Sequence, residues 1–482
     1  MSALVLVLDA GMGGGRAAIY DERGEALALA ARPWRPFAPR ALAPFGREYD
    51  AGALADALDA ATLEALAAVD ADAIEAIACT GQRIACAFLD EAGEVVYAGP
   101  NGDVRALAAG GVELGDDDED YARTGRFPAW IHAPARLAWF REHRPGDFAR
   151  VARVVGLPGW AAHRLTGCAA LDRTIAADLA MLDVARGERL AACPAPRWPP
   201  LAAPTAILGE LSSVAAARLG LRAGLPVAVG CADTQAALLF GGEDTLVAGS
   251  SAPLVRACAT PARDPARRLW LDPDLRAGGF ALEANLGEMG AAHAWLREML
   301  DLPTFDAFDA LARTAPAGAR GASAHLGPRA MDLRALNASR PAGLLFPFGE
   351  TSGGDAPRRA DLARSFLESC AFAARAGRAW LDAALPAPPA LSLLGGMSRS
   401  RVLADALATT LGVPVLAGPA DATARGAAAC ALVAARLASD LEDARERLRV
   451  EPARHEPSPH DRDALEDAFE RWQEREAALE EM

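Results

Sequence analysis

Apolar and polar positions alternate along the chain in short blocks that predict an α/β protein. The first thirty residues hold two apolar segments, LVLVLD and RAAIYD, on either side of the glycine-rich turn AGMGGG. A second turn at Arg23 and Gly24 precedes EALALA. Apolar runs joined by short glycine-containing turns are typical of antiparallel hairpins. We therefore expect three short antiparallel strands at the N-terminus.

From residue 50 to residue 242 the pattern changes repeatedly between helical and strand periods. Residues 50–69 and ARLAWFREH have helical spacing, whereas AIEAIACTG and the hairpin AFLDEAGEVVYA are typical of strands. The segment VAVGCADTQAALLFGG passes from an apolar strand through Asp233 into a helix that ends at Gly241 and Gly242. We expect the first domain to end directly after this helix.

The hairpin pattern returns near residue 245 as DTLVAGSSAPLVRA, so the two halves of the chain are expected to be related. Farther on, RADLARSFLESCAFAARAGRAWLDA predicts a helix. The segment LSLLGGMSRSRVLADALATTLGVPVL predicts a strand, a double glycine, a helix and another strand. That order is typical of a nucleotide-contacting unit, in which the backbone approaches a ligand at a helix N-terminus.

The length of 482 residues predicts about three domains at roughly 150 residues each, and two large α/β domains fit as well. We place an N-terminal domain at 1–243, a C-terminal domain at 244–440 and a charged helical extension at 441–482. The last segment, DRDALEDAFERWQEREAALEEM, is typical of a solvated surface helix.

Charge and residue usage exclude several kinds of function. A formal net charge of −15 argues against a nucleic-acid surface, which needs clustered basic residues. All 49 basic side chains are arginine, because the chain contains no lysine. A Walker A loop, a protein-kinase site and a pyridoxal phosphate Schiff base each require a lysine. None of these three sites can therefore be present.

The eight cysteines contain no C-x-x-C pair and no short Cys/His spacing that would frame a metal. They are typical of reduced, buried thiols. The N-terminus lacks a basic n-region, and no apolar run approaches the roughly 18 residues that span a membrane. We expect a cytoplasmic protein with no membrane partner.

The first candidate site is the turn that follows Asp9. Asp9 ends an apolar strand and precedes a run of glycines that closes at Arg16. Successive backbone N–H groups in such a turn form an anion nest, and a neighbouring carboxylate can hold Mg²⁺. An ordinary tight hairpin is the alternative. The second Gly/Ser turn, from Gly249 to Ala252, favours phosphate binding, because two such loops can hold one polyphosphate between them.

The second candidate is Asp233, which stands at the C-terminal end of a strand and before a helix. Catalytic groups of α/β proteins concentrate at such positions, and helix capping favours aspartate there equally well. Both interpretations stay open on these residues alone.

The order of these signals resembles the FGGY carbohydrate kinases over nearly the whole chain. The family pattern D-x-G-T-x-x-x-R is similar to DAGMGGGR, from Asp9 to Arg16. The substrate loop and W-x-D-x-R resemble TGQR, Thr80 to Arg83, and NGDVR, Asn101 to Arg105. The general-base segment G-x-x-D-x-x-x-A resembles GCADTQAA around Asp233.

Four later segments continue the resemblance in the family's order. G-T-S-G resembles GSSA, and P-Y-x-x-G-E-R resembles LFPFGETSGGD with Gly349 and Glu350 retained. The adenosine motif G-G-G-x-S resembles GGMSRS from Gly395, and A-T-A-L-G-A-A resembles ATARGAAA. DAGMGGGRAAIYD, PWRPF and PNGDVRA are closer to the autoinducer-kinase branch, whereas GQR and DTQAALLFGG are closer to glycerol kinase.

The resemblance implies two ribonuclease H-like domains, as in actin and hexokinase, with a cleft between them. It also implies ATP-dependent phosphorylation of a hydroxyl on a small sugar, ketose or polyol. Asp233 would accept the hydroxyl proton and Asp9 would position Mg²⁺. The residues implied in ATP binding are Gly11, Met12, Gly13, Arg16, Gly249, Ser250, Ser251, Gly395, Gly396 and Ser398. Those implied in substrate binding are Gln82, Arg83, Asp103, Arg105 and Gln235, with Trp130 and His132 near an aromatic family position.

Several positions depart from the family pattern, and they keep alternatives open. Met12 replaces a threonine near the phosphates, Ile84 and Asn101 alter the substrate loops, and Arg425 replaces a leucine. A structural salt bridge between Asp103 and Arg105 is the alternative to substrate contact. A protein of this fold that binds a sugar or nucleotide without turnover is the alternative function. A chaperone or filament protein fits less well, because no segment resembles a peptide-binding domain or a polymerisation surface. A homodimer is a candidate assembly.

Overall fold

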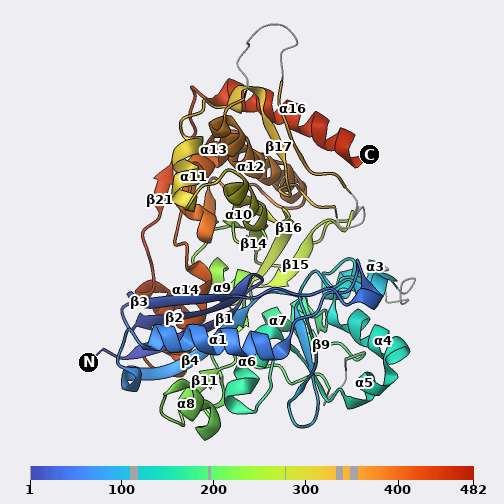
Figure 1. The fold of residues 1–482 in the computed structure, drawn as a ribbon, viewed down its shortest axis with the longest axis vertical. Helices are drawn as coiled ribbons and strands as arrows, with labels where there is room; N and C mark the ends of the chain where they lie inside the picture. The colour runs from blue at the N-terminus through green and yellow to red at the C-terminus, as the bar shows by residue number, and fades with distance from the viewer. Residues whose placement is uncertain are drawn as a thin grey trace. The chain divides into compact units, whose positions relative to one another are not determined.

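The chain folds into two α/β units, each built around its own mixed sheet (Figure 1). The computed structural model describes residues 2–108, 118–193, 197–276, 278–332, 340–347 and 357–481. Unit 1 comprises residues 1–240, 271–280 and 422–449, and unit 2 comprises residues 241–270, 281–421 and 450–482. The two-domain α/β fold class predicted from the sequence is confirmed. The limits 1–243, 244–440 and 441–482 stay predictions.

The main sheet of unit 1 begins with the predicted N-terminal hairpins. Its strand order is β10-β11-β4-β1-β2-β3, and β12 also pairs with β4. β1 is antiparallel to β2 and parallel to β4, and β2 is antiparallel to β3, which confirms the three antiparallel strands expected at the N-terminus. The strand bounds are β1 (Leu4–Ala10), β2 (Gly14–Asp21), β3 (Ala26–Pro33), β4 (Ile74–Gly81), β10 (Ile207–Glu210), β11 (Pro226–Ala228) and β12 (Cys231–Ala232).

Both faces of this sheet are buried, which explains why β1 is apolar from Leu4 to Leu8, directly before Asp9. Leu4, Leu6 and Leu8 belong to one core cluster, and Val5 and Val7 belong to the other. Alternate side chains of a strand point to opposite faces, so a strand covered on both sides needs apolar residues at every position. The helices of the first cluster are α1 (Ala51–Leu66), α6 (Leu157–Thr166) and α8 (Ser213–Leu219). Those of the second are α9 (Asp233–Leu238), α14 (Ala422–Ala434) and α15 (Leu441–Arg447).

A smaller part of unit 1 surrounds the three-stranded sheet β6-β5-β7. Phe88, Tyr97 and Phe140 pack together there with ring centroids 4.9 to 5.4 Å apart. The remaining strands are β5 (Cys86–Leu89), β6 (Val95–Gly99), β7 (Arg153–Gly156), β8 (Leu182–Asp183) and β9 (Glu188–Arg189). The remaining helices are α2 (Arg105–Ala108), α3 (Asp118–Thr124), α4 (Ala133–His143), α5 (Pro145–Arg150) and α7 (Arg173–Asp178).

Unit 2 repeats the opening topology of unit 1. β13 is antiparallel to β14 and parallel to β19, as β1 is to β2 and β4, so the two related halves expected from the sequence are confirmed at this point. Its main sheet contains β13 (Asp244–Val247), β14 (Pro253–Cys258), β16 (Phe280–Asn285), β19 (Leu391–Leu394), β20 (Val415–Ala417) and β21 (Ala453–His455). The chain passes from unit 2 into unit 1 along β15 (Trp270–Pro273).

The helices and the remaining short elements complete the fold. The helices of unit 2 are α10 (Met289–Met299), α11 (Phe305–Ala312), α12 (Arg359–Ala384), α13 (Arg401–Leu411) and α16 (Arg462–Glu480), beside the hairpin β17 (Ser323–His325) and β18 (Gly343–Leu345). The 3-10 helices are η1 (Arg40–Leu42), η2 (Ala71–Ala73), η3 (Ala129–Ile131), η4 (Ala319–Gly321) and η6 (Gly396–Arg399). Over the described ranges, none of the helices combines the length and the apolar character needed to cross a membrane.

The last helix corrects the expectation of a solvated surface helix. α16 buries Leu465, Phe469 and Trp472, and both aromatic rings pack against Phe372 of α12 at centroid distances of 5.6 and 6.0 Å. The spacing i, i+4, i+7 gives one apolar stripe on an otherwise charged helix. The many charges in this segment obscured that stripe.

Helix α9, which begins at Asp233, is held by a close approach of α14. A Cβ atom at Gly426 would lie 2.1 Å from the backbone oxygen of Ala236. No side chain fits at that distance, so only glycine allows the two helices to pack in this way.

We predict that Gly426→Ala lowers the thermal unfolding midpoint by about 2–5 °C, because overpacking costs about 1–3 kcal/mol. Differential scanning calorimetry measures the shift. Gly146→Ala is the matched control, since a Cβ there meets no atom within 4 Å and the residue lies in helix α5. The control should leave the midpoint unchanged or raise it. Equal midpoints for Gly426→Ala and the wild type would contradict this account of helix packing.

Candidate functional site

Three parallel strand ends of unit 1 place Asp9 and Asp233 at the same edge of the sheet. β4 lies between β1 and β12, with Thr80 in register with Asp9 on one side and with Cys231 on the other. Two strand spacings separate β1 from β12 by about 9.5 Å. Asp233 follows β12 directly and begins α9. The sheet thus brings together two acidic residues that are far apart in the sequence.

The Asp9 carboxyl is buried and only half satisfied. Its Oδ2 accepts a hydrogen bond from Arg16 at 3.1 Å, whereas Oδ1 is buried and has no hydrogen-bond partner in the described part of the chain. Burial raises the pKa of Asp9, and the Arg16 guanidinium opposes that shift. Arg16 itself keeps 55% of its side chain exposed. A buried carboxylate oxygen without a donor is a fitting ligand for a hard cation.

The glycine turn after β1 is anchored through its carbonyl groups. The Gly11 amide donates to the Gly14 carbonyl at 3.1 Å, and the Gly11 carbonyl accepts from the Trp34 indole at 3.0 Å. Tyr49 donates from its hydroxyl to the Met12 carbonyl at 3.4 Å. Gly13 is exposed, and a Cβ atom there would meet nothing within 4 Å. The turn therefore leaves open space beside the backbone, and Met12 is half-buried in it.

One oxygen of the Asp233 carboxyl is hydrogen-bonded within helix α9. One carboxyl oxygen accepts from the Thr234 amide at 2.7 Å, and Ala232 is the N-cap residue. Within the described residues, no side chain other than Thr234 bonds to this carboxyl. Asp233 is therefore the first residue of α9 and not its N-cap, and the helix has no side-chain cap hydrogen bond. The Thr234 amide occupies one oxygen of the Asp233 carboxyl and leaves the other available.

The environment of Asp233 tunes its acidity. Part of the side chain reaches solvent, but protein atoms surround the carboxyl closely, and this burial raises its pKa to about 6. The positive charge of Arg83 lowers the pKa of Asp233, and the negative charge of Asp9 raises it. A carboxyl with a pKa near neutrality is suited to proton transfer.

Gln82 connects the loop after β4 with the glycine turn. Its amide nitrogen donates to the Tyr49 hydroxyl at 2.7 Å, and that hydroxyl in turn bonds Met12. Burial raises the pKa of Tyr49 to about 12, so its hydroxyl keeps its proton and can donate. The predicted substrate loop and the predicted phosphate turn therefore share one hydrogen-bond chain.

Arg83 belongs to a buried cluster of charged side chains. It lies 3.9 Å from both Asp178 and Asp272, and Arg126 pairs with the same two carboxyls at 3.2 and 2.5 Å. A cavity of about 10 Å³ is lined by Gln82, Arg83 and Asp178 among others. Its volume is close to the space that one water molecule occupies.

The sequence did not single out Arg126, Asp178 or Asp272. Asp272 ends the apolar segment LWLD, which is a strand-end signal of the same kind as that of Asp9. Arg126 and Asp178 have no local pattern, because their ion-pair partners lie 52 or more positions away. His132, by contrast, was predicted to lie near an aromatic family position, and its Nδ1–H donates to the Asp178 carbonyl at 2.9 Å. Burial lowers the pKa of His132 to about 3, so the ring stays neutral.

Asp103 and Arg105 form the structural salt bridge that was one of the two alternatives. Arg105 Nε donates to Asp103 at 2.7 Å and Nη2 donates to Glu48 at 2.9 Å. The guanidinium also lies 4.5 Å from the Tyr97 ring centroid, and the Tyr97 hydroxyl donates to Asp103. Both side chains are completely buried. This geometry favours a supporting role beside the predicted substrate loops.

Gln235 differs from Asp103 and Arg105 because its side chain is buried without hydrogen bonds to described residues. Its side chain is only 1% exposed, and neither its amide nitrogen nor its amide oxygen has a hydrogen-bond partner in the described chain. A buried amide without partners costs free energy of about 1–3 kcal/mol, which a ligand or an ordered water would recover. Arg425, which replaces a family leucine, donates to the carbonyls of Gly24 and Leu448.

Unit 2 brings together the two segments predicted to bind the nucleotide. Gly395 has a φ of +86°, and a Cβ atom there would lie 2.8 Å from the Ala248 carbonyl. Met397 donates its amide to the same carbonyl at 3.2 Å, and Gly249 follows directly in the chain. The hydroxyl of Ser398 donates to the Gly418 carbonyl at 2.8 Å. Gly249, Ser250, Ser251, Gly395 and Gly396 thus form one backbone-rich surface, whereas Gly349 and Glu350 lie outside the described residues.

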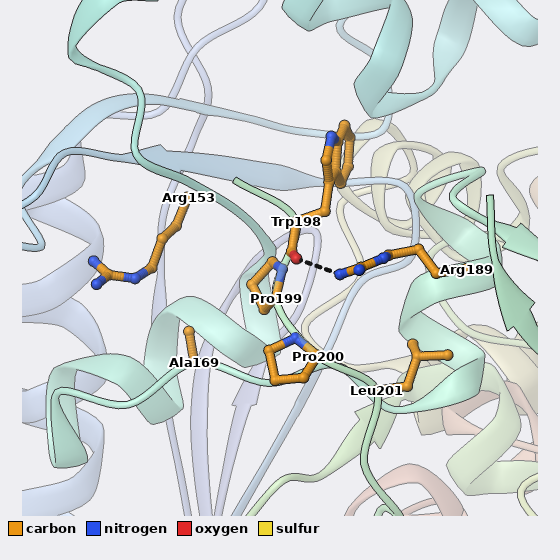
Figure 2. A pocket seen from close by; sticks show the side chains of 7 residues that line it. All are labelled: Arg153, Ala169, Arg189, Trp198, Pro199, Pro200 and Leu201. Atoms are coloured by element: carbon orange, nitrogen blue, oxygen red, sulfur yellow. Dashed lines mark hydrogen bonds between the residues drawn. The ribbon is translucent and has the colours of Figure 1, made fainter. Parts of the chain in front are cut away.

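One surface cavity lies elsewhere in unit 1. Its volume is about 550 Å³, and Figure 2 shows its lining residues Arg153, Ala169, Arg189, Trp198, Pro199, Pro200 and Leu201. Arg189 donates a hydrogen bond to the Trp198 carbonyl at 2.8 Å. None of the predicted site residues lines this cavity, so its presence does not change the candidate site.

Comparison with known proteins gives matches along nearly the whole chain. The model of the FGGY family of carbohydrate kinases, N-terminal domain, matches residues 4–241, and that of the C-terminal domain matches residues 245–435. Autoinducer-2 kinase of Klebsiella pneumoniae is 27% identical, over 97% of this chain and 93% of the relative.

Solved structures match the fold. Xylulose kinase of Rhodospirillum rubrum is 27% identical with a TM-score of 0.77, over 99% of both chains. Ligand-bound xylulose kinase of Lactobacillus acidophilus is 19% identical with a TM-score of 0.82, over 99% of this chain and 98% of that one. The two family matches together span most of the sequence, and the chain belongs to the FGGY family of carbohydrate kinases.

Proposed function

We propose that this chain transfers the γ-phosphoryl group of ATP to a hydroxyl of a small sugar, ketose or polyol. The observation that carries the proposal is the Asp233 carboxyl, which stands at the strand edge with one oxygen available and a pKa of about 6. Membership of a family of carbohydrate kinases supports the same reaction class.

Asp233 acts as the general base in this proposal. The available oxygen of Asp233 accepts the proton of the acceptor hydroxyl, while the hydroxyl oxygen attacks the γ-phosphorus in line with the departing ADP oxygen. Gln82, Arg83 and Gln235 bind the acceptor, and the unpartnered amide of Gln235 supports that role. Asp103 and Arg105 contribute by holding the loop that follows β6.

Backbone N–H groups and arginine replace lysine at the phosphates. We assign phosphate and nucleotide contacts to Gly11, Met12, Gly13 and Arg16 in unit 1 and to Gly249, Ser250, Ser251, Gly395, Gly396 and Ser398 in unit 2. The hydroxyl of Ser398 is already bonded to Gly418, so Ser398 would contribute through its backbone or by holding the loop.

Asp9 is the residue that would hold Mg²⁺. Its buried, unpartnered Oδ1 fits a hard cation, and no cluster of three or more metal-ligating side chains occurs among the described residues. Mg²⁺ typically takes one or two carboxylates and completes its shell with water and phosphate oxygens. When bound, the ion would neutralise charge on the phosphates.

The first test is consumption of ATP in the presence of a panel of ketoses, polyols and their deoxy analogues. The panel should include xylulose and autoinducer-2, because structural and sequence relatives carry those names. Acceptor-dependent formation of ADP and of a phosphorylated product supports the proposal. Nucleotide binding without turnover on any acceptor would favour the alternative, a binding protein of this family, for which Met12 is the motivating residue.

Asp233→Asn should reduce kcat by a factor of about 10² to 10⁴ and leave acceptor and nucleotide binding nearly unchanged, because only the proton acceptor is lost. Steady-state kinetics measure kcat, and calorimetric titration measures binding. Asp90→Asn is the control, since Asp90 pairs with Arg150 in another part of unit 1. Full activity in Asp233→Asn would remove Asp233 from the role of base.

The pH dependence of kcat/KM should show the titration of Asp233. Asp233 must be ionised to accept a proton, so kcat/KM should fall as the pH decreases below about 6. Arg83→Met removes a positive charge that lowers the pKa of Asp233, and the acidic limb should then move to higher pH. Arg150→Met, which removes an exposed arginine, should leave the limb in place. An unchanged limb in Arg83→Met would show that Arg83 does not tune the base.

A further inference from the structure

A completely buried arginine joins the two loops that carry the proposed acceptor-binding residues. Arg136 lies in the first turns of α4 and is 0% exposed. Its guanidinium donates to the carbonyls of Ile84 at 3.4 Å, Gly99 at 3.5 Å and Asn101 at 3.4 Å, and to Cys86 Sγ at 3.6 Å. Ile84 and Cys86 follow β4, whereas Gly99 and Asn101 end and follow β6. One side chain therefore contacts both loops.

The guanidinium of Arg136 is held by hydrogen bonds from its two terminal nitrogens, and its buried Nε has no hydrogen-bond partner in the described chain. No carboxylate in the described ranges forms a salt bridge with it, and its hydrogen bonds go to three carbonyl dipoles and a thiol. Burial alone would lower the pKa of Arg136, but Tyr97, Cys86 and Asp103 raise it above its usual value. The guanidinium therefore stays charged, and a charged donor strengthens hydrogen bonds to carbonyls. A buried cation of this kind is costly unless the loops around it keep their positions.

The loop after β4 needs such a restraint. Ile84 has a φ of +67°, a left-handed conformation that β-branched residues rarely adopt. Its carbonyl is one of the acceptors of Arg136. Gln82 and Arg83 immediately precede it, and the Gln82 side-chain oxygen accepts from the Asn101 amide at 3.5 Å. A change at Arg136 would therefore reach both acceptor loops at once.

Helix α4 is itself attached to the charged cluster. His132, the N-cap residue of α4, donates from Nδ1 to the Asp178 carbonyl at 2.9 Å. Asp178 in turn lies 3.9 Å from Arg83. The start of α4 thus contacts the acceptor loop directly through Arg136 and contacts the partner of Arg83 through His132.

We infer that Arg136 is a positioning residue for acceptor binding, which holds Gln82 and Arg83 in place from behind through the backbone of the two loops. Arg136 is 0% exposed, so in this inference it acts through the loops and not by contact with acceptor or nucleotide. It would then set the affinity for the acceptor more than the rate of phosphoryl transfer. The functional half of this inference rests on the proposed function. The structural half, restraint of residues 82–86 and 99–103, stands without it.

The test compares Arg136→Met, Arg136→Lys and the control Arg164→Met in the full chain. Arg164 is an arginine of unit 1 that pairs with Asp59 at 2.8 Å and stacks on Trp160, away from both loops. Hydrogen exchange with mass spectrometry reports the order of residues 82–86 and 99–103 whether or not the protein is active. Steady-state kinetics on an acceptor from the panel give KM and kcat separately.

Arg136→Met should accelerate exchange in both loops and raise the acceptor KM about tenfold to a hundredfold, with a smaller change in kcat. Arg136→Lys should recover part of both effects, because it keeps the positive charge. Arg164→Met should lower thermal stability and leave loop exchange and KM unchanged.

Unchanged exchange in Arg136→Met, or equal loop exchange in Arg136→Met and Arg164→Met, would overturn the restraint. Faster exchange with an unchanged KM would overturn the link to acceptor binding. Faster exchange in Arg136→Met in a protein whose wild type turns over no acceptor would support the restraint and contradict the proposed function. If Arg136→Met does not fold, Arg136→Lys decides between the same outcomes.

Discussion

Parallel pairing of β1, β4 and β12 is the constraint on which the candidate site depends. The pairing sets the ends of three strands side by side, so that Asp9, Gln82 and Asp233 emerge at one edge of the sheet. In this register the Leu side chains of β1 enter one core and the Val side chains enter the other, so a slip by one residue would exchange side chains of different size between two packed cores. The close contact of Gly426 with Ala236 then holds the helix that starts at Asp233.

Burial and neighbouring charges set the pKa values of the two carboxyls at this edge. Burial raises the pKa values of both Asp9 and Asp233, and arginines oppose the shift at each carboxyl. Because the chain has no lysine, guanidinium groups serve at every cationic position, and several of them are buried among carboxylates, carbonyls or aromatic rings. Arg83 shares Asp178 and Asp272 with Arg126, which keeps its charge close to the proposed base.

The sequence was sufficient for the features that are local in the chain. Alternating apolar positions and glycine turns predicted the hairpins, and Asp9 and Asp233 were recognisable because each ends an apolar strand. The choice between the two roles of Asp103 and Arg105 needed coordinates, because Tyr97 and Glu48 come from other elements. Arg126, Arg136, Asp178 and Asp272 could not be predicted, since tertiary packing alone brings their partners together. The buried stripe of α16 was present in the spacing of Leu465, Phe469 and Trp472, but the charge of the segment concealed it.

The ionisation of Asp233 tests the central claim most directly. Carbon-13 NMR of protein labelled at aspartate carboxyl groups follows each titration, and the difference between the wild type and Asp233→Asn assigns the resonance of Asp233. The account predicts a pKa of about 6, as expected for a buried carboxyl beside Asp9 and Arg83. Titration at the ordinary aspartate value of about 3.9 would contradict it, because the carboxyl would then be a solvated group and a poor proton acceptor.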